Sequence, residues 1–189
     1  MKSDFSVTVR RAEVPEAKML TGLMRRAFRD AFEHNTRVDD LNAHMNSNFT
    51  LQRQQAELSN PGAQTLLAIV NAQPVGYAQI HPGPSPECVN TERTVQMQRF
   101  YLLKPFWGTN VANLLMKACI AALSQGSYNA VWLSCWDQNK RALSFYRRWG
   151  FSQCGTVPFI VGSDRQTDFI LTRPLGVAKM QSPGNHLSR

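Results

Sequence analysis

Residues 106–116, FWGTNVANLLM, place a glycine shortly before an apolar helix pattern. A strand-to-helix turn leaves the first backbone N–H groups of the helix free, and the helix dipole adds partial positive charge there. Both features favour a bound anion such as a phosphate. Gly108 lets the backbone approach a ligand closely and adopt a positive φ. Asparagine, present here as Asn110, is the non-glycine residue that best tolerates the left-handed, positive-φ conformation. From this segment alone, an anion site and an ordinary turn both remain open.

A tyrosine on the next predicted helix is the second group that could do chemistry. In residues 139–150, NKRALSFYRRWG, apolar and aromatic residues recur at helical spacing and predict one inward face. Tyr146 belongs to this face, so its hydroxyl needs a hydrogen-bond partner. The inward face consists of Asn139, Ala142, Phe145, Tyr146 and Trp149.

Cysteine and histidine spacing argues against a metal centre. The four cysteines form no CxxC pair, and the four histidines are scattered along the chain. This pattern predicts neither a disulfide framework nor a zinc site, so we expect reduced, mostly buried thiols and no metal. The cysteines are Cys88, Cys119, Cys135 and Cys154.

The charge balance favours an anionic ligand. The chain has 21 Lys and Arg against 13 Asp and Glu, a formal net charge of +8. The basic residues are spread out and form no dense run, so we do not expect nucleic-acid binding. No apolar stretch approaches the roughly 18 residues of a spanning helix, and no secretory signal is present, so we expect a cytoplasmic protein without a membrane partner.

The elements that must position these groups follow from hydrophobic periodicity. Residues 34–50 are polar and remain ambiguous. The order predicts a mixed α/β domain over residues 1–175, with a disordered tail over 176–189. Strands are expected over 5–12, 63–70, 74–80, 93–103, 130–136, 156–162 and 167–175, and helices over 16–33, 51–58, 111–126 and 139–150.

The order strand, glycine turn, helix, strand and then N…A…FY…GF resembles the GCN5-related N-acetyltransferases, over about residues 95–175. The segments AFRDAFEHN, AELSNPGAQTLLAIV, PVGYAQI, RFYLLKPFWG and VGSDRQTDFIL extend the similarity to about residues 5–175, where the chain resembles bacterial polyamine acetyltransferases and the small-amine or protein acetyltransferases near them. The resemblance implies a mixed, mostly antiparallel sheet with splayed central strands, flanked by about four helices. It also implies acetyl transfer from acetyl-CoA to an amine by direct attack in a ternary complex.

The resemblance assigns roles to individual residues. The strand that carries Phe100, Tyr101, Leu102 and Leu103 would pair its backbone with the pantetheine arm of acetyl-CoA, and one N–H there would polarise the thioester carbonyl. The turn would hold the pyrophosphate, and Tyr146 would protonate the departing thiolate, with a core tyrosine as the alternative. The implied cofactor-binding residues are Tyr101, Leu102, Leu103, Gly108, Thr109, Asn110, Val111, Ala112, Asn113 and Asn139.

Three positions depart from the family pattern. In the pyrophosphate motif, Trp107 replaces a Gln or Arg and Asn110 replaces the central glycine. Backbone N–H groups survive both changes, so we expect binding to persist. Gln96 stands near the position where many relatives have a glutamate base, and glutamine cannot accept a proton.

Acidic residues and one histidine are candidates for handling the amine. His81 or Glu92 could act as a base through water, and no base is needed if the amine arrives neutral. Asp30 and Glu33 on the first helix, together with Glu92, could orient a cationic amine, with a solvated helix face as the alternative for the first two. We expect Cys135 to be a core cysteine rather than a nucleophile.

Two function classes remain open at this point. The first is the N-acetyltransferase, acting on a small amine, a polyamine or a peptide amine, as a monomer or homodimer. The second is a catalytically weak CoA-binding or regulatory module of the same fold, which the changes at Gln96, Trp107 and Asn110 would favour. Tyr146 argues against the second class, because a binding module does not need that hydroxyl.

Overall fold

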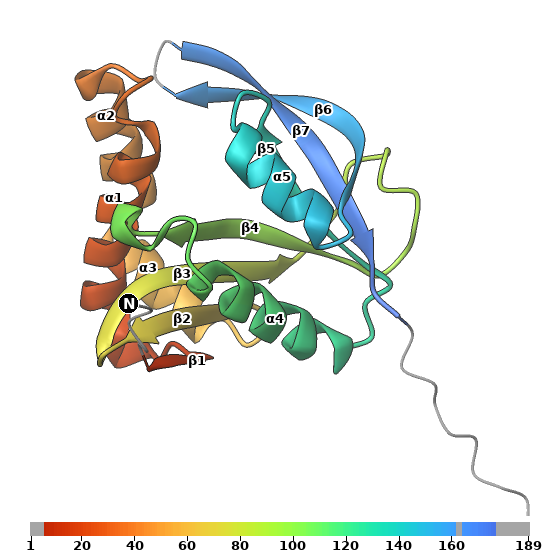
Figure 1. Cartoon of the computed structure of the whole chain (residues 1–189), viewed down its shortest axis with the longest axis horizontal. Coiled ribbons are helices and arrows are strands. Elements are labelled where there is room, and N and C mark those ends of the chain that lie inside the picture. The colour runs from red at the N-terminus through yellow and green to blue at the C-terminus, as the bar shows by residue number, and fades with distance from the viewer. Residues whose placement is uncertain (1–5, 162–163, 177–189) are drawn as a thin grey trace, which may run out of the picture.

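The computed structural model describes residues 6–161 and 164–176 of the chain. Figure 1 shows a sheet with helices packed against it. The strands are β1 (Val7–Arg11), β2 (Gln64–Val70), β3 (Gln73–Pro82), β4 (Thr94–Leu102), β5 (Ala130–Trp136), β6 (Ser152–Val161) and β7 (Asp164–Pro174). The α-helices are α1 (Ala17–Phe32), α2 (Val38–Asn48), α3 (Leu51–Ser59), α4 (Val111–Ser124) and α5 (Lys140–Arg148), with short 3-10 turns at Val14–Glu16 and Lys104–Phe106.

The seven strands form one sheet in the order β1-β2-β3-β4-β5-β7-β6. Every neighbouring pair is antiparallel except β4 and β5, which are parallel. A parallel pair requires a crossover, and α4 supplies it between β4 and β5. The predicted mixed, mostly antiparallel sheet is therefore confirmed.

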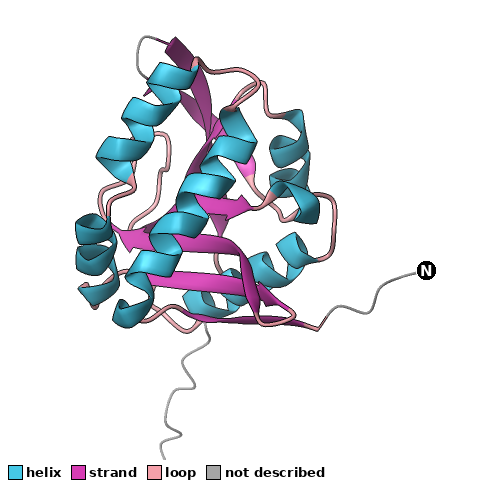
Figure 2. Ribbon diagram, turned by 90° about the vertical axis from the view of Figure 1, so that its left-hand side faces the viewer, coloured by secondary structure: helices cyan, strands magenta, loops and turns pink. Residues whose placement is uncertain are grey.

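Side chains alternate between two cores, one on each face of the sheet. In β2, Leu66 packs with α4 residues such as Leu115, whereas the adjacent Leu67 packs with α1 residues such as Leu20. The same alternation separates Ala78 from Tyr77 in β3. Figures 1 and 2 show the helices on both faces that these cores require.

The central strands β4 and β5 separate after a short paired stretch. Their parallel pairing covers only Thr94–Gln96 against Ala130–Trp132, although β4 continues to Leu102 and β5 to Trp136. A register shift between Gln79 and Ile80 of β3, opposite Gln98, bends β4 near the point of separation. The predicted splay is confirmed, and it leaves an edge of each strand free of the other.

Helix α2 lies in the segment that the sequence left ambiguous. Its apolar pattern is weak because only Leu41 and Met45 are buried. Asp39 and Asp40 lie in its first turn, where negative charge interacts favourably with the helix dipole. The structure thus has five α-helices among the described residues, whereas about four were predicted. The disordered tail was predicted for residues 176–189. All of these except Gly176 lie outside the described residues.

The four thiols are free, and Cys119 and Cys135 are buried as expected. Sequence spacing gave no sign that Cys88 and Cys154 would meet, yet their sulfur atoms are 3.1 Å apart. The loop between β3 and β4 brings Cys88 against β6, where a Cβ on Gly155 would lie 2.8 Å from its Sγ. Gly155 therefore permits close packing of this loop.

The turn between β2 and β3 contains a strained alanine. Asn71 and Ala72 both have positive φ, 49° and 62°, as a two-residue hairpin turn requires. This conformation costs a residue with a Cβ about 1–2 kcal/mol. We expect Ala72→Gly to raise the free energy of unfolding by about 1 kcal/mol, measured by denaturant unfolding. Ala56→Gly, at an exposed position inside α3, should lower it by about 1 kcal/mol. Equal destabilisation by both changes would contradict the strain at Ala72.

Candidate active site

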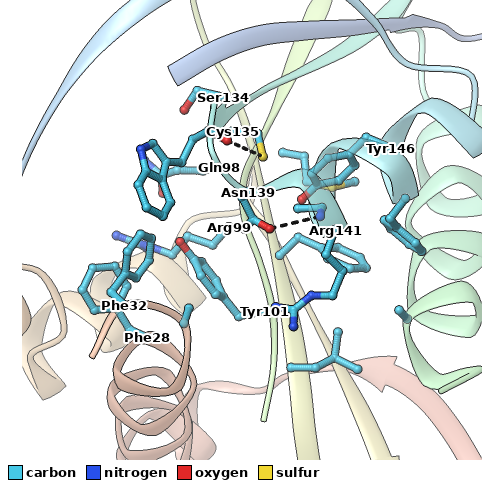
Figure 3. Close-up of a pocket in the computed structure, with 18 of the residues that line it drawn as sticks. Phe28, Phe32, Gln98, Arg99, Tyr101, Ser134, Cys135, Asn139, Arg141 and Tyr146 are labelled. Carbon is cyan, nitrogen blue, oxygen red and sulfur yellow. Dashed lines mark hydrogen bonds between the residues drawn. The ribbon is translucent and has the colours of Figure 1, made fainter. Parts of the chain in front are cut away.

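A cavity of about 480 Å³ opens where β4 and β5 separate (Figure 3). Its walls come from both faces of the sheet and form two regions. The helix half consists of Trp107, Gly108, Thr109, Ala112, Asn113, Asn139, Arg141, Ala142, Phe145 and Tyr146. The aromatic half consists of Phe28, Phe32, His44, Phe49, Arg53, Tyr101, Trp136, Phe159 and Asp168.

The start of α4 presents free backbone donors to the helix half. Among the described residues, no hydrogen-bond acceptor faces the N–H groups of Gly108, Asn110, Ala112 and Asn113. Two neighbouring donors are already used: the Thr109 N–H bonds Phe106 O, and the Val111 N–H bonds Thr109 Oγ1. The free N–H groups and the helix dipole together favour an anion at this position.

Backbone conformation explains how this turn works with one glycine. Gly108 has φ 74°, and a Cβ built there would meet nothing within 4 Å, so the backbone faces open space. Asn110 has φ −70° and ψ −8°, a right-handed conformation open to any residue. The argument that asparagine is needed here for the left-handed region is therefore wrong. Its side chain instead accepts a hydrogen bond from Asn113 Nδ2 at 3.2 Å.

Trp107 recruits a cation from α5 to the same region. Its indole Nε1 donates to Leu102 O at 2.8 Å, which fixes the ring beside the end of β4. The Arg141 guanidinium lies over this ring, 3.7 Å from its centroid. Partial burial lowers the pKa of Arg141 from its ordinary value, but the group stays charged at neutral pH. Arg141 therefore places a positive charge beside Trp107.

The register of β4 decides which backbone groups face the gap. The Leu103 N–H donates to Val75 O at 2.8 Å, so it already has its acceptor in the β3 edge. By alternation, Tyr101 also turns its backbone toward β3, while Phe100 and Leu102 turn theirs toward the gap. The bond from Trp107 to Leu102 O agrees with this assignment. The structure therefore favours Phe100 and Leu102, not Tyr101 and Leu103, as residues whose backbones could pair with a ligand.

Tyr146 lies in the wall of the helix half and is 7% exposed. Its ring packs against Phe100, Phe145 and Phe151. Burial raises the pKa of Tyr146 well above its ordinary value, so the hydroxyl keeps its proton. Figure 3 shows Tyr146 beside Asn139 and Cys135, and its hydroxyl has no hydrogen-bond partner among the described residues. The hydroxyl can therefore donate to a ligand in the cavity.

Two asparagines of the helix half also have structural roles. Asn139 Oδ1 accepts from the Ala142 N–H at 3.1 Å and caps α5, which leaves its Nδ2 as a free donor. Asn113 Oδ1 accepts from Trp149 Nε1 at 3.2 Å and joins α4 to α5. These bonds hold the two helices that border the cavity in a fixed relation.

Cys135 lines the cavity but is not a nucleophile in this state. Burial raises the pKa of its thiol to about 12. Only the thiolate is reactive, so the side chain is inert at neutral pH. This agrees with the expectation of a core cysteine.

The structure places the acidic candidates outside the cavity wall. Asp30 Oδ2 accepts the Lys104 N–H at 2.8 Å and so fixes the segment after β4. Glu33 Oε1 lies 3.9 Å from Lys104 Nζ. Glu92 lies in the loop before β4. His81 is also outside, whereas Gln96 does line the cavity. The geometry therefore does not support these acids or His81 as groups that touch a substrate.

Asp168 is a cavity residue that the sequence reasoning missed. It lies in β7 opposite Trp136 of β5 and is 6% exposed, and its buried Oδ1 has no hydrogen-bond partner among the described residues. Burial raises the pKa of Asp168 from its ordinary value, and a hydrogen bond with Ser134 opposes that rise. A carboxylate at a buried strand position is the signal that could have identified it.

His44 was missed as well. Its ring stacks on Phe28 with centroids 4.6 Å apart. Burial, together with the nearby charges of Arg99 and Arg53, lowers the pKa of His44, so the imidazole is neutral at pH 7. A neutral imidazole in the cavity wall could accept a proton.

Two other features are absent from the part of the chain that the structure describes. No group of three or more His, Cys, Asp or Glu side chains there is arranged to hold a metal ion. None of the described helices is long and apolar enough to cross a membrane.

Sequence comparison adds independent information. A profile described as Acetyltransferase (GNAT) family matches residues 23–151. An uncharacterised N-acetyltransferase of Lactobacillus delbrueckii subsp. lactis is 24% identical over 169 residues, which cover 89% of this chain and 96% of that protein. An uncharacterised N-acetyltransferase of Mycobacterium bovis is 30% identical over 131 residues, 69% of this chain and 80% of that protein.

Structural comparison gives the same fold. The PaiA N-acetyltransferase from Thermoplasma acidophilum, solved in complex with coenzyme A, superposes with a TM-score of 0.74. Sequence identity is 16%, and the match covers 89% of this chain and 99% of that chain. At this identity the likeness establishes the fold, and the profile match over most of the chain establishes the family. The chain therefore belongs to the acetyltransferase (GNAT) family and is an acetyl-CoA-dependent N-acetyltransferase.

Proposed function

We propose that this protein transfers the acetyl group of acetyl-CoA to a primary amine by direct attack in a ternary complex. One observation supports the proposal above the others. A single cavity joins the N–H groups of Gly108, Ala112 and Asn113, which have no acceptor among the described residues, with the Tyr146 hydroxyl and the aromatic half. An anionic cofactor arm, a proton donor and an acceptor can therefore meet in one space.

The residues present fit acetyl-CoA. The N–H groups of Gly108, Asn110, Ala112 and Asn113 would hold the pyrophosphate, with the Arg141 guanidinium beside them. The backbone of Phe100 and Leu102 would pair with the pantetheine arm, to which Asn139 Nδ2 can also donate. In this arrangement Thr109 and Val111 shape the turn, because their N–H groups are already bonded.

The chain's groups then assist one displacement at the thioester carbonyl. A bond forms from the amine nitrogen to the carbonyl carbon while the carbon–sulfur bond breaks, and the proton that the nitrogen loses replaces the one that Tyr146 gives to the sulfur. A gap-facing N–H of β4 stabilises the charge that develops on the carbonyl oxygen. Tyr146 gives its proton to the departing sulfur. Acetyl-CoA supplies the acyl group, and no covalent enzyme intermediate is needed.

Burial acts on both partners of the proton transfer from Tyr146. In water a phenol of pKa about 10 is a weak donor to a thiolate whose thiol pKa is about 8.5. In this cavity burial raises the pKa of the Cys135 thiol to about 12, and the departing sulfur would experience similar desolvation. The thiolate therefore becomes a stronger base in the same environment that raises the pKa of Tyr146.

Arg141→Ala should weaken acetyl-CoA binding about 10- to 100-fold. The change removes a charge-assisted contact to the pyrophosphate, a contribution of about 1.5–3 kcal/mol. Calorimetric titration measures the dissociation constant. Lys140→Ala is the matched control, since Lys140 is an exposed residue of the same helix and does not line the cavity. An equal loss in both variants would indicate general electrostatic attraction and contradict a specific role for Arg141.

A panel of amines tests the function itself. Release of free CoA thiol is followed with acetyl-CoA and a set of monoamines, polyamines, amino acids and peptides. Amine-dependent release, with the acetylated amine identified by mass spectrometry, is the expected result. Tight binding of acetyl-CoA without turnover of any amine would instead support the CoA-binding or regulatory module, which Gln96 in the cavity wall favours.

A further inference from the structure

Six aromatic rings surround the aromatic half of the cavity. They come from separate parts of the chain: Phe28 and Phe32 from α1, Phe49 from the turn before α3, Tyr101 from β4, Trp136 from β5 and Phe159 from β6. Phe28 makes ring contacts with Phe32, at 4.5 Å between centroids, and with Tyr101, at 6.2 Å. Such a surface favours a flat apolar body over an extended polar chain.

One carboxylate faces this surface. Of the described residues that line the cavity, Asp168 is the only Asp or Glu. Its Oδ1 is buried and has no hydrogen-bond partner in the part of the chain that the structure describes, while a hydrogen bond with Ser134 orients the carboxyl group. An unpaired oxygen of a buried carboxylate is costly, and an ammonium N–H would satisfy it. Figure 3 shows Ser134 above the Phe28–Phe32 pair in this view.

The cations in the wall limit the ligand to one ammonium. Arg53 and Arg99 both line the cavity, and both bond Glu57, which does not line it. A second ammonium would find no second carboxylate in the described wall and would be repelled by these guanidinium groups. A carboxylate on the ligand would gain little from Arg99 Nη1, which already donates to Glu57 and Gln79.

We infer that the acceptor is an arylalkyl monoamine, which binds as an ammonium held by Asp168, gives one proton to that carboxylate to become the neutral nucleophile, and places its ring among the aromatic side chains of α1, β4 and β6. This inference rests on the proposed acetyl transfer. It excludes polyamines and aromatic amino acids as preferred acceptors. It makes Asp168, rather than Asp30 or Glu33 of the first helix, the carboxylate that binds the substrate.

The test compares four amines with the wild-type protein. The probes are 2-phenylethylamine, butylamine, spermidine and phenylalanine, each at saturating acetyl-CoA. The highest kcat/KM is expected for 2-phenylethylamine. A higher value for spermidine, butylamine or phenylalanine would overturn the inference while leaving acetyl transfer intact. Binding of acetyl-CoA with no turnover of any amine in the wider panel would overturn the proposed function itself.

Asp168→Asn tests the carboxylate. The change keeps the size of the side chain and removes its charge, so KM for 2-phenylethylamine should rise about 10- to 100-fold, as expected for a lost charge-assisted bond. The KM for acetyl-CoA and its thermal shift should stay unchanged, which shows that the fold is intact. Asp39→Asn, at an exposed position of α2 outside the cavity wall, is the matched control and should leave both KM values unchanged. An unchanged amine KM in Asp168→Asn would overturn the assignment, and the wild-type panel decides the acceptor class even if this variant fails to fold.

Discussion

Tyr146→Phe is expected to lower kcat about 10²- to 10⁴-fold while leaving the dissociation constant of acetyl-CoA nearly unchanged. The ring of Tyr146 packs against Phe100, Phe145 and Phe151, and phenylalanine keeps all of these contacts. Only the hydroxyl is lost, and it has no partner within the described residues whose bonding would be disturbed. Steady-state kinetics with the preferred amine, together with calorimetry, measures both quantities.

The pH profile separates a proton donor from a structural tyrosine. The active form of Tyr146 is protonated, and burial raises its pKa well above the ordinary value of about 10. The wild-type kcat should therefore not fall between pH 7 and 10 through ionisation of this residue. Tyr128→Phe, at a tyrosine outside the cavity wall, should retain full activity. Full activity in Tyr146→Phe, or equal losses in both variants, would exclude Tyr146 as the proton donor.

The second large effect concerns stability. Glu57→Gln should lower the free energy of unfolding by about 3–5 kcal/mol, because it leaves the Arg99 charge buried without its partner. The side chains of Arg99 and Glu57 are only 10% and 13% exposed, and their atoms Nη1 and Oε2 are 3.0 Å apart. Gln79 Nε2 also donates to Glu57 Oε2 at 3.0 Å. Denaturant unfolding should show the loss, and the melting temperature should fall by roughly 6–20 °C.

The same pair gives a pH dependence of known sign. Burial alone would raise the pKa of Glu57, but the Arg99 charge and hydrogen bonds from Arg53, Gln79 and Arg99 outweigh it and lower the pKa. A lowered folded-state pKa means that the stabilisation is complete above the unfolded pKa of about 4.3 and is lost as pH falls through the folded value. The stability difference between wild type and Glu57→Gln should therefore be largest near neutral pH and shrink below about pH 4.

An exposed ion pair provides the control for Glu57. Arg10 Nη2 and Glu16 Oε1 are 2.7 Å apart, and the two side chains are 49% and 23% exposed. Glu16→Gln should change stability by no more than about 1 kcal/mol, since solvent screens this pair. Similar small changes in both variants would show that Arg99 tolerates the loss of its partner and would refute the stability argument.

Local sequence signals predicted the elements that position the site. Gly108 and the apolar repeat after it identified the start of α4, and the spacing around Tyr146 identified the inward face of α5. Both signals depend on neighbours within a few turns of one helix. The apolar pattern of α2 is weak, because only Leu41 and Met45 are buried in an otherwise polar segment, so the sequence did not predict this helix.

The residues that the sequence placed wrongly or missed depend on distant partners. The register of β4 against β3 turns Phe100 and Leu102 toward the gap, and a register shift opposite Gln98 precedes them. Asp168 enters the cavity only because β7 pairs with β5. Arg141 meets Trp107 across the gap between α5 and the turn before α4. Strand pairing and packing between helices set these contacts, and residue spacing along the chain does not encode them directly.

The most direct test of the central claim is a thermal shift with acetyl-CoA, made on wild type and on Tyr146→Phe. A ligand at 100 times its dissociation constant adds about 2.7 kcal/mol to the free energy of unfolding. For a chain of this size, the melting temperature should rise by roughly 5–10 °C in both proteins, because the start of α4 is the same in both. No shift in either protein at saturating acetyl-CoA would contradict the account, since it would mean that the free N–H groups of Gly108, Asn110, Ala112 and Asn113 do not form a cofactor site.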